Sequence, residues 1–185
     1  MILTISGAPG SGKTSVAHLL ASQLRIPYYS IGSLRGKMAL ERGLTLDEFN
    51  RLGETDETTD TLVDEYQTEL GKRDETCIIE GRLSWHFIPN SFKIFLDCNP
   101  QTAAERIFRA KQLNGDRPDE PTYTSVMDAA HWIRERVASD GRRYEKYYGV
   151  NFLDPSHYDL VIDTSRRTSA EDTANAVLEA LAKKA

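Results

Sequence analysis

The chain has 185 residues, of which 39% are hydrophobic and 28% are charged, and its formal net charge is −5. These values suit one ordinary globular domain, so we expect residues 1–185 to form a single domain. The acidic balance argues against a general nucleic-acid-binding protein, and no apolar run is long enough to cross a membrane.

The first expected elements are a strand and a helix joined by a glycine-rich turn. Residues 1–6 form a short apolar run typical of a buried strand, and apolar residues recur at helical spacing from Val16 to Leu24. The turn between them matches the phosphate-binding pattern G-x-x-x-x-G-K-[ST] at each fixed position, with the residues Gly7, Ala8, Pro9, Gly10, Ser11, Gly12, Lys13 and Thr14. The flanking strand and helix favour this interpretation over a glycine-rich turn that binds nothing.

Each residue type in this turn suits a nucleoside triphosphate. The glycines allow the backbone to wrap closely around an anion, and the backbone N–H groups and the positive end of the following helix then face the phosphates. Lys13 is expected to reach the β- and γ-phosphates, and the Thr14 hydroxyl is expected to bind Mg²⁺. The turn therefore predicts ATP and Mg²⁺ as ligands.

A mainly helical segment comes next. Residues 31–42 are predicted to form a helix that ends at Gly43. Thr45 and Glu48 have the spacing of a capping box, which indicates the start of a short helix. Residues 58–72 carry the apolar spacing of a longer amphipathic helix.

Further apolar runs are expected to pair with the first strand. They span residues 26–30, 76–80, 92–97 and 158–163, and the last three of them end in a carboxylate. Apolar strands that alternate with helices indicate a parallel sheet covered on both faces, so we predict an α/β protein with the three-layer α/β/α P-loop NTPase fold and a five-stranded parallel sheet. Ligands bind at the carboxyl ends of such strands, where the glycine-rich turn, Glu80, Arg82 and Asp97 are expected to meet.

A long polar excursion separates the last two predicted strands. We expect helices over residues 101–112 and 122–148, with a break at 114–121 that contains glycine, aspartate and proline. This excursion is too large for a simple crossover between strands. It therefore predicts a helical lid insertion over about residues 106–145.

Short blocks of sequence between residue 1 and about residue 165 carry a family resemblance. They are GAPGSGKT at 7–14, Ser30-x-Gly32, Glu41-Arg42-Gly43, Glu80-Gly81-Arg82, Ala104-Glu105-Arg106-Ile107, and residues 134–144 and 158–165. Together they resemble the cytidylate kinase family of P-loop nucleoside monophosphate kinases. The first block alone is specific only for nucleoside triphosphates. The resemblance of the later blocks implies a nucleoside monophosphate as phosphate acceptor, bound by the helical segment at about residues 30–73.

Arg136, Asp140 and Arg143 stand at positions i, i+4 and i+7, so they share one helix face. The resemblance implies that both arginines contact phosphates and are catalytic together with Lys13, while Asp140 contacts the acceptor. The alternative is a solvated, salt-bridged surface, which is common on long helices. The expected position of this helix above the phosphate-binding turn favours the site.

For the acceptor, the resemblance implies binding by Ser30, Gly32, Arg35, Glu80, Gly81, Arg82 and Asp140. Relatives carry the acceptor-phosphate arginine one position after Arg35, where this chain has Gly36, so either Arg35 or Lys37 is expected to take that part. Arg82 suits a planar phosphate or a base edge, although a strand-end surface charge is the simpler alternative. Glu80 is expected either to act near Mg²⁺ through water or to hold Arg82.

Two arginines, Arg106 and Arg109, lie on the helix that leads into the lid. The resemblance implies that Arg106 lies over the adenine of ATP and that a second basic residue reaches the phosphates. Because this chain has Ala110 where relatives carry that second residue, Arg109 or Lys111 is expected to substitute. An exposed amphipathic face is the alternative interpretation.

These features predict ATP-dependent phosphorylation of a nucleoside monophosphate, with CMP or dCMP as the favoured acceptor. A kinase for another acceptor, such as AMP, UMP, shikimate or gluconate, is one alternative. A nucleotide-dependent switch that hydrolyses ATP slowly is another. We expect the protein to act as a monomer without a nucleic-acid partner. The sequence opens directly with the first strand and has no charged leader, which predicts a cytoplasmic location.

Overall fold

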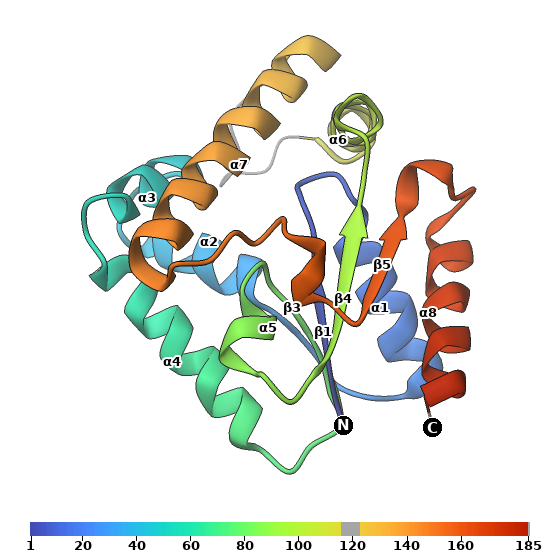
Figure 1. Ribbon diagram of the computed structural model, residues 1–185. Coiled ribbons are helices and arrows are strands. Elements are labelled where there is room, and N and C mark those ends of the chain that lie inside the picture. The colour runs from blue at the N-terminus through green and yellow to red at the C-terminus, as the bar shows by residue number, and fades with distance from the viewer. Residues whose placement is uncertain (116–122, 185) are drawn as a thin grey trace.

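The structure is a computed structural model, and it describes residues 1–115 and 123–184. Its strands form one sheet in the order β2-β3-β1-β4-β5. They are β1 (Ile2–Ser6), β2 (Tyr28–Ser30), β3 (Cys77–Glu80), β4 (Phe92–Asp97) and β5 (Leu160–Asp163). Every neighbouring pair is parallel, so the carboxyl ends of the strands lie at one edge (Figure 1). The predicted five-stranded parallel sheet is confirmed.

Helices cover both faces of this sheet (Figure 1). Helices α1 (Lys13–Leu24) and α8 (Ala170–Lys184) pack on one face, and α4 (Thr58–Lys72) and α5 (Ser84–Phe87) pack on the other. The remaining helical elements are α2 (Ile31–Glu41), α3 (Leu46–Gly53), α6 (Pro100–Asn114), α7 (Val126–Tyr148) and the 3₁₀ turns η1 (Pro155–His157) and η2 (Thr164–Arg166). Within the described residues, no helix is both long enough and apolar enough to cross a membrane.

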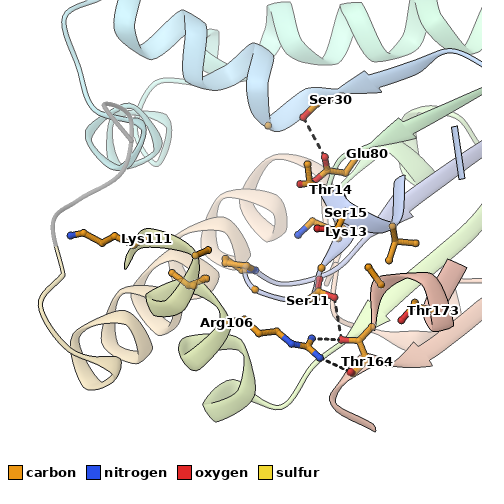
Figure 2. A pocket seen from close by; sticks show the side chains of 18 of the residues that line it. Ser11, Lys13, Thr14, Ser15, Ser30, Glu80, Arg106, Lys111, Thr164 and Thr173 are labelled. Carbon is orange, nitrogen blue, oxygen red and sulfur yellow. Dashed lines mark hydrogen bonds between the residues drawn. The ribbon is translucent and has the colours of Figure 1, made fainter. Parts of the chain in front are cut away.

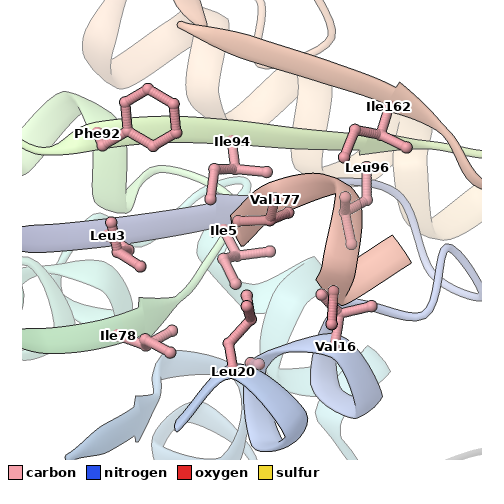
Figure 3. Packing of buried hydrophobic residues seen from close by; sticks show 12 residues of the cluster. Leu3, Ile5, Val16, Leu20, Ile78, Phe92, Ile94, Leu96, Ile162 and Val177 are labelled. Atoms are coloured by element: carbon pink, nitrogen blue, oxygen red, sulfur yellow. The ribbon is translucent and has the colours of Figure 1, made fainter. Parts of the chain in front are cut away.

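The core follows from the alternation of side chains along the strands. Leu3 and Ile5 of β1 are fully buried on the face covered by α1 and α8, where they pack in one cluster with side chains such as Leu20 and Val177 (Figure 3). Burying a leucine or isoleucine side chain stabilises a fold by about 1.5–3 kcal/mol. Thr4 points to the opposite face, where its Oγ1 lies 2.9 Å from Ser91 Oγ. This packing fixes the sheet edge on which the site is built.

The predicted helices over 31–42 and 58–72 are confirmed, and so is the capping box. The Thr45 N–H donates to Glu48 Oε2 over 2.8 Å, and the Glu48 N–H donates to Thr45 Oγ1 over 3.3 Å. This pair of bonds satisfies backbone donors that would otherwise lack partners at the start of α3. It thereby fixes a helix that contributes to the buried ion-pair network described below.

The helix predicted over 122–148 begins later, at Val126. Ser125 Oγ accepts the Asp128 N–H at 3.1 Å, and Thr124 Oγ1 donates to the Asp128 carboxylate at 2.7 Å, so these polar side chains cap the helix from outside it. The preceding helix runs to Asn114, beyond the predicted end at 112. Most of the predicted break at 114–121, and the central part of the predicted lid, lie outside the described residues.

Candidate active site

A cavity of about 720 Å³ lies at the carboxyl edge of the sheet. Its wall contains the glycine-rich turn, the start of α2, the end of β3, one side of α6 and α7, and the start of α8 (Figure 2). Carboxyl ends of parallel strands are where α/β proteins bind their ligands. The sequence segments that predicted ligands therefore do converge on one space.

The glycine-rich turn has a backbone that only glycine adopts without strain. Gly10 has a φ of 79°, and a Cβ there would lie 2.6 Å from the backbone oxygen of Ala103. Gly12 has a φ of 86° and open space around it. Glycine is therefore favoured there by the left-handed backbone conformation and not by close packing. Helix α1 begins at the next residue, so the positive end of its dipole faces the cavity. The turn is shaped as a cradle for phosphate.

Lys13 lines the cavity together with Glu80, Arg82 and Arg136. Its Nζ donates to the backbone oxygen of Ala8 over 2.9 Å, within the turn. Burial and the nearby Arg82 guanidinium lower the pKa of Lys13 to about 8, although Glu80 opposes this shift. A phosphate bound in the turn would place further negative charge beside Lys13 and would raise its pKa again.

Glu80, at the end of β3, faces Thr14 at the start of α1 (Figure 2). Its Oε1 accepts the Thr14 hydroxyl at 3.2 Å, and its Oε2 accepts the hydroxyls of Tyr28 at 2.6 Å and Ser30 at 3.3 Å. Hydroxyl and carboxylate oxygens are the ligands that Mg²⁺ prefers. No group of three or more His, Cys, Asp or Glu side chains could hold a metal among the described residues. A metal at Thr14 would therefore depend on phosphate oxygens as well.

The predicted face of Arg136, Asp140 and Arg143 is buried rather than solvated. Asp140 is fully buried and accepts three guanidiniums, from Arg82 at 3.1 Å, Arg136 at 3.4 Å and Arg143 at 3.0 Å. Burial alone would raise the pKa of Asp140, but these three cations hold it well below its usual range. Arg82 thus pairs with Asp140, while Glu80 binds hydroxyl groups. Within the cluster of Asp140 and its three arginines, Arg82 and Arg136 line the cavity, whereas Asp140 and Arg143 do not.

Arg35 and Arg143 meet in a second buried cluster, which is not part of the cavity wall. Arg35 Nη1 pairs with Asp60 Oδ1 at 2.7 Å, and Arg143 Nε lies 3.1 Å from Asp60 Oδ2. Asn50 Oδ1 accepts Arg35 Nε at 2.7 Å and Arg143 Nη1 at 3.3 Å. Arg35 is 6% exposed and Arg143 is 1% exposed, and neither lines the cavity. Lys37, the alternative to Arg35, is exposed on α2 and does not line the cavity either.

Gly53, at the end of α3, allows this close approach. A Cβ at Gly53 would lie 2.7 Å from Thr59 Oγ1, 3.0 Å from Arg143 Cδ and 3.1 Å from Arg35 Nη2. The Nη2 atom of Arg35 and the Nδ2 atom of Asn50 are buried donors without a hydrogen-bond partner among the described residues. The acceptor atoms in this region therefore do not satisfy all of its buried hydrogen-bond donors.

Asp47 joins α3 to α7 at the cavity. Its Oδ2 accepts the indole N–H of Trp132 at 2.6 Å, and its Oδ1 lies 3.3 Å from Arg136 Nη1. Both Trp132 and Arg136 line the cavity. The segment predicted to bind the acceptor and the helix predicted to form part of the lid are thus in direct contact.

Arg106 lines the cavity from α6 and is held by η2. Its Nη1 donates to Thr164 Oγ1 over 3.1 Å, and its Nη2 donates to the Thr164 backbone oxygen over 2.8 Å (Figure 2). Arg109 is exposed and does not line the cavity. Lys111 does line it. Of the two substitutes considered for the second basic residue, Lys111 is the one that faces the candidate site.

The cavity wall therefore includes most of the predicted site residues. Those that line it are Pro9, Gly10, Ser11, Gly12, Lys13, Thr14, Ser30, Gly32, Glu80, Arg82, Arg106 and Arg136. Those that stand outside the wall are Gly7, Ala8, Arg35, Gly81, Arg109, Asp140 and Arg143. Gly81 is needed for close packing, because a Cβ at this position would lie only 2.9 Å from Ile31 Cγ1.

The sequence patterns used above, such as motifs and helical spacing, did not identify four residues that hold this site together. Asp47, Asn50 and Asp60 belong to helices whose polar residues suit any solvated face, and their arginine partners are 15 to 93 positions away. Tyr28 sits in a short strand that predicts only packing. Residues 134–143 contain more arginines than acidic residues. If these arginines are buried, they need carboxylates from elsewhere in the chain, and this excess was the one indication that such partners exist.

Comparison with known proteins agrees with the predicted resemblance. The model of the cytidylate kinase-like family matches residues 2–166. A cytidylate kinase of Methanocella arvoryzae is 39% identical over 166 residues, which cover 90% of this chain and 89% of that protein. A cytidylate kinase of Methanosphaera stadtmanae is 31% identical over 184 residues, which cover 100% of this chain and 99% of that protein.

Solved structures share the fold at low sequence identity. An uncharacterized protein from Eubacterium ventriosum has a TM-score of 0.70 at 17% identity, covering 97% of this chain and 96% of that one. A shikimate kinase from Bacteroides thetaiotaomicron has a TM-score of 0.67 at 15% identity, covering 98% of each chain. These likenesses confirm the predicted P-loop kinase fold, and the family match assigns the sequence within it. The chain belongs to the cytidylate kinase-like family.

Proposed function

We propose that this protein transfers the γ-phosphoryl group of ATP to CMP or dCMP, giving ADP and CDP or dCDP. The observation that carries the proposal is that Lys13 and the pair Arg82 and Arg136 line one cavity of about 720 Å³. A cradle for a triphosphate and two guanidiniums for a second anion thus share one space. The cytidylate kinase relatives, matched over nearly their whole length, support the choice of a cytidine nucleotide.

The two sides of the cavity suit the two nucleotides. On one side, the turn at residues 7–14, with Lys13, is proposed to hold the ATP phosphates. Arg106 and Lys111 line the same cavity and are proposed to contact the base and the phosphates of ATP. On the other side, Arg82 and Arg136 are proposed to bind the phosphate of the acceptor. Facing phosphates from opposite sides is the arrangement that direct transfer requires.

The residues at Thr14 fit a magnesium ion. Thr14 and Glu80 present oxygen ligands 3.2 Å apart, beside the phosphate cradle. We propose that Thr14 binds the ion directly and that Glu80 acts through water. When bound there, Mg²⁺ would neutralise charge on the phosphates of ATP.

The chemistry asked of the chain's own residues is alignment and charge stabilisation. Phosphoryl transfer of this kind needs no covalent intermediate, and charge on the migrating group is spread over its oxygens. Lys13, Arg82 and Arg136 supply positive charge around that group. Asp140 is buried behind the cavity wall and pairs with three guanidiniums, so its proposed part is to hold them rather than to take a proton.

The test is a panel of acceptors with ADP release as the readout. CMP or dCMP should stimulate ADP release most strongly, ahead of UMP and AMP, with shikimate and gluconate inactive. If AMP, UMP or shikimate gave the highest kcat/KM, the cytidine assignment would be wrong while the kinase assignment remained. If no acceptor changed the rate of ADP release, the protein would be a nucleotide-dependent switch instead.

A further inference from the structure

We propose that Tyr28 is a positioning residue that aims the Glu80 carboxylate at Thr14 and keeps it away from Lys13. This inference rests on the proposed Mg²⁺·ATP site. Tyr28 does not belong to the cavity wall and does not touch the phosphate cradle. Its hydroxyl instead donates to Glu80, which does line the cavity.

The two oxygens of Glu80 have different partners. Oε2 accepts the Tyr28 hydroxyl at 2.6 Å, the shortest of the three hydroxyl contacts, and also Ser30 Oγ at 3.3 Å. Oε1 is left to Thr14, at 3.2 Å. Because hydrogen bonds to a charged group are short and directional, the bond from Tyr28 fixes the rotation of the carboxylate. That rotation decides which oxygen faces the proposed metal ligand.

The fold gives Tyr28 a fixed place beside Glu80. Strands β2 and β3 are parallel neighbours, with Tyr28 opposite Ile78 and Ser30 opposite Glu80. The Tyr28 ring packs at 4.5 Å between centroids against His18 of α1, and it also contacts the core cluster under that helix. A tyrosine held at its ring by α1 and by its own strand places its hydroxyl reproducibly, which a longer flexible side chain would not do.

Lys13 is the competitor for the same carboxylate. Glu80 and Lys13 both line the cavity and are oppositely charged side chains, so the two groups attract each other. An ion pair between them would withdraw Lys13 from the phosphates and Glu80 from Thr14 at once. The hydroxyl of Tyr28 opposes formation of that ion pair, because it holds Glu80 Oε2 by a hydrogen bond from β2.

The test uses Tyr28→Phe, which keeps the ring and removes only the hydroxyl. Tyr29→Phe is the matched control, since the Tyr29 hydroxyl donates to Glu75 at 3.0 Å and stands outside the cavity wall. Two quantities are measured in wild type and in each variant. One is the binding of ADP by calorimetry with and without Mg²⁺, which needs no turnover, and the other is the Mg²⁺ concentration that gives half-maximal ADP release with CMP.

We expect Tyr28→Phe to weaken the Mg²⁺-dependent part of ADP binding by roughly ten-fold and to raise the half-maximal Mg²⁺ concentration to a similar degree, as loss of a hydrogen bond to a charged group should. KM for CMP should stay unchanged. In a Glu80→Gln background, Tyr28→Phe should have no further effect, because the tyrosine acts only through that carboxylate.

The proposal is overturned if Tyr28→Phe leaves the Mg²⁺ dependence of ADP binding as in wild type, if Tyr29→Phe shifts it equally, or if the effect of Tyr28→Phe persists in Glu80→Gln. Wild-type protein that binds ADP equally with and without Mg²⁺ would remove both the metal site and this proposal. The acceptor panel is a separate result, because acceptor-dependent ADP release can be measured in wild type whatever Tyr28 does.

Discussion

Asp60 on α4 and Arg143 on α7 form a buried ion pair, with 3.1 Å between the carboxylate Oδ2 and the guanidinium Nε. The other oxygen of Asp60 pairs with Arg35 on α2 at 2.7 Å. One carboxylate thus joins three helices. The side chains of Asp60, Arg35 and Arg143 are at most 7% exposed, so water screens these charges little.

Replacement of Asp60 by asparagine should destabilise the protein by about 3–5 kcal/mol, because it removes the carboxylate that pairs with buried Arg35 and one of the two that pair with buried Arg143. Equilibrium urea unfolding measures the change. Glu69→Ala on the same helix is the control, since Glu69 pairs with Lys72 on an exposed surface and should matter little. Similar unfolding midpoints for the two variants would contradict the structural part assigned to Asp60.

Lys13→Ala should abolish acceptor-dependent ADP release without unfolding the protein. Lys13 contributes one hydrogen bond within the turn, to Ala8, but it supplies the charge proposed to face the transferred phosphoryl group. Coupled ADP release gives the activity, and thermal unfolding shows whether the fold is retained. Turnover near the wild-type rate in a folded Lys13→Ala variant would exclude the proposed part of Lys13.

Arg82→Ala should raise KM for CMP by roughly ten-fold or more, because a charge-assisted hydrogen bond to the acceptor is lost, while KM for ATP changes little. Arg82 lines the cavity and has Asp140 as its ion-pair partner, at 3.1 Å. Initial rates at varied CMP and at varied ATP separate the two constants. Arg73→Ala, at the exposed residue that follows α4, should behave as wild type. A selective rise in KM for ATP would place Arg82 on the other side of the cavity.

Asp64 should make stability depend on pH near neutrality. Burial raises the pKa of Asp64 from 3.8 to about 7, and nearby Asp60 adds to the shift, while a short hydrogen bond from the Tyr148 hydroxyl opposes it. The folded protein therefore binds a proton that the unfolded chain has lost. The resulting stability is present in full below about pH 4 and disappears as the pH rises through about 7.

Asp64→Asn removes this titration and keeps a side-chain oxygen for Tyr148. The free energy of unfolding of wild type, measured by urea between about pH 5 and about pH 8, should fall relative to that of the variant as the pH rises. Parallel curves for the two proteins would show that Asp64 titrates at an ordinary pKa in the folded state.

The sequence predicts those parts of this protein that are local. The phosphate-binding turn is one contiguous segment between a strand and a helix, and the five strands are short apolar runs, so both could be recognised without knowing the fold. The ends of helices were predicted less accurately. Helix α7 begins at Val126 because Ser125 accepts the Asp128 N–H and caps the helix, whereas helical spacing alone extends the prediction to residue 122.

The buried charges were harder to predict because they depend on pairs that are distant in sequence. The spacing of Arg136, Asp140 and Arg143 indicated a common helix face, but a solvated surface has the same spacing. Only the packing of α3 and α4 against that face shows which carboxylates accept the guanidiniums. For the same reason Arg35, considered as an acceptor ligand, is found bonded to Asp60 and Asn50.

Gly53 sets a limit on how this protein can vary. The hydrogen atom that stands in for its side chain is all that separates the α3 backbone from Thr59, Arg143 and Arg35. Even one methyl group would push apart charges whose mutual neutralisation depends on contact. Natural or engineered variants should therefore retain glycine at residue 53 even though its backbone angles are open to every amino acid, since the constraint there is spatial and not conformational.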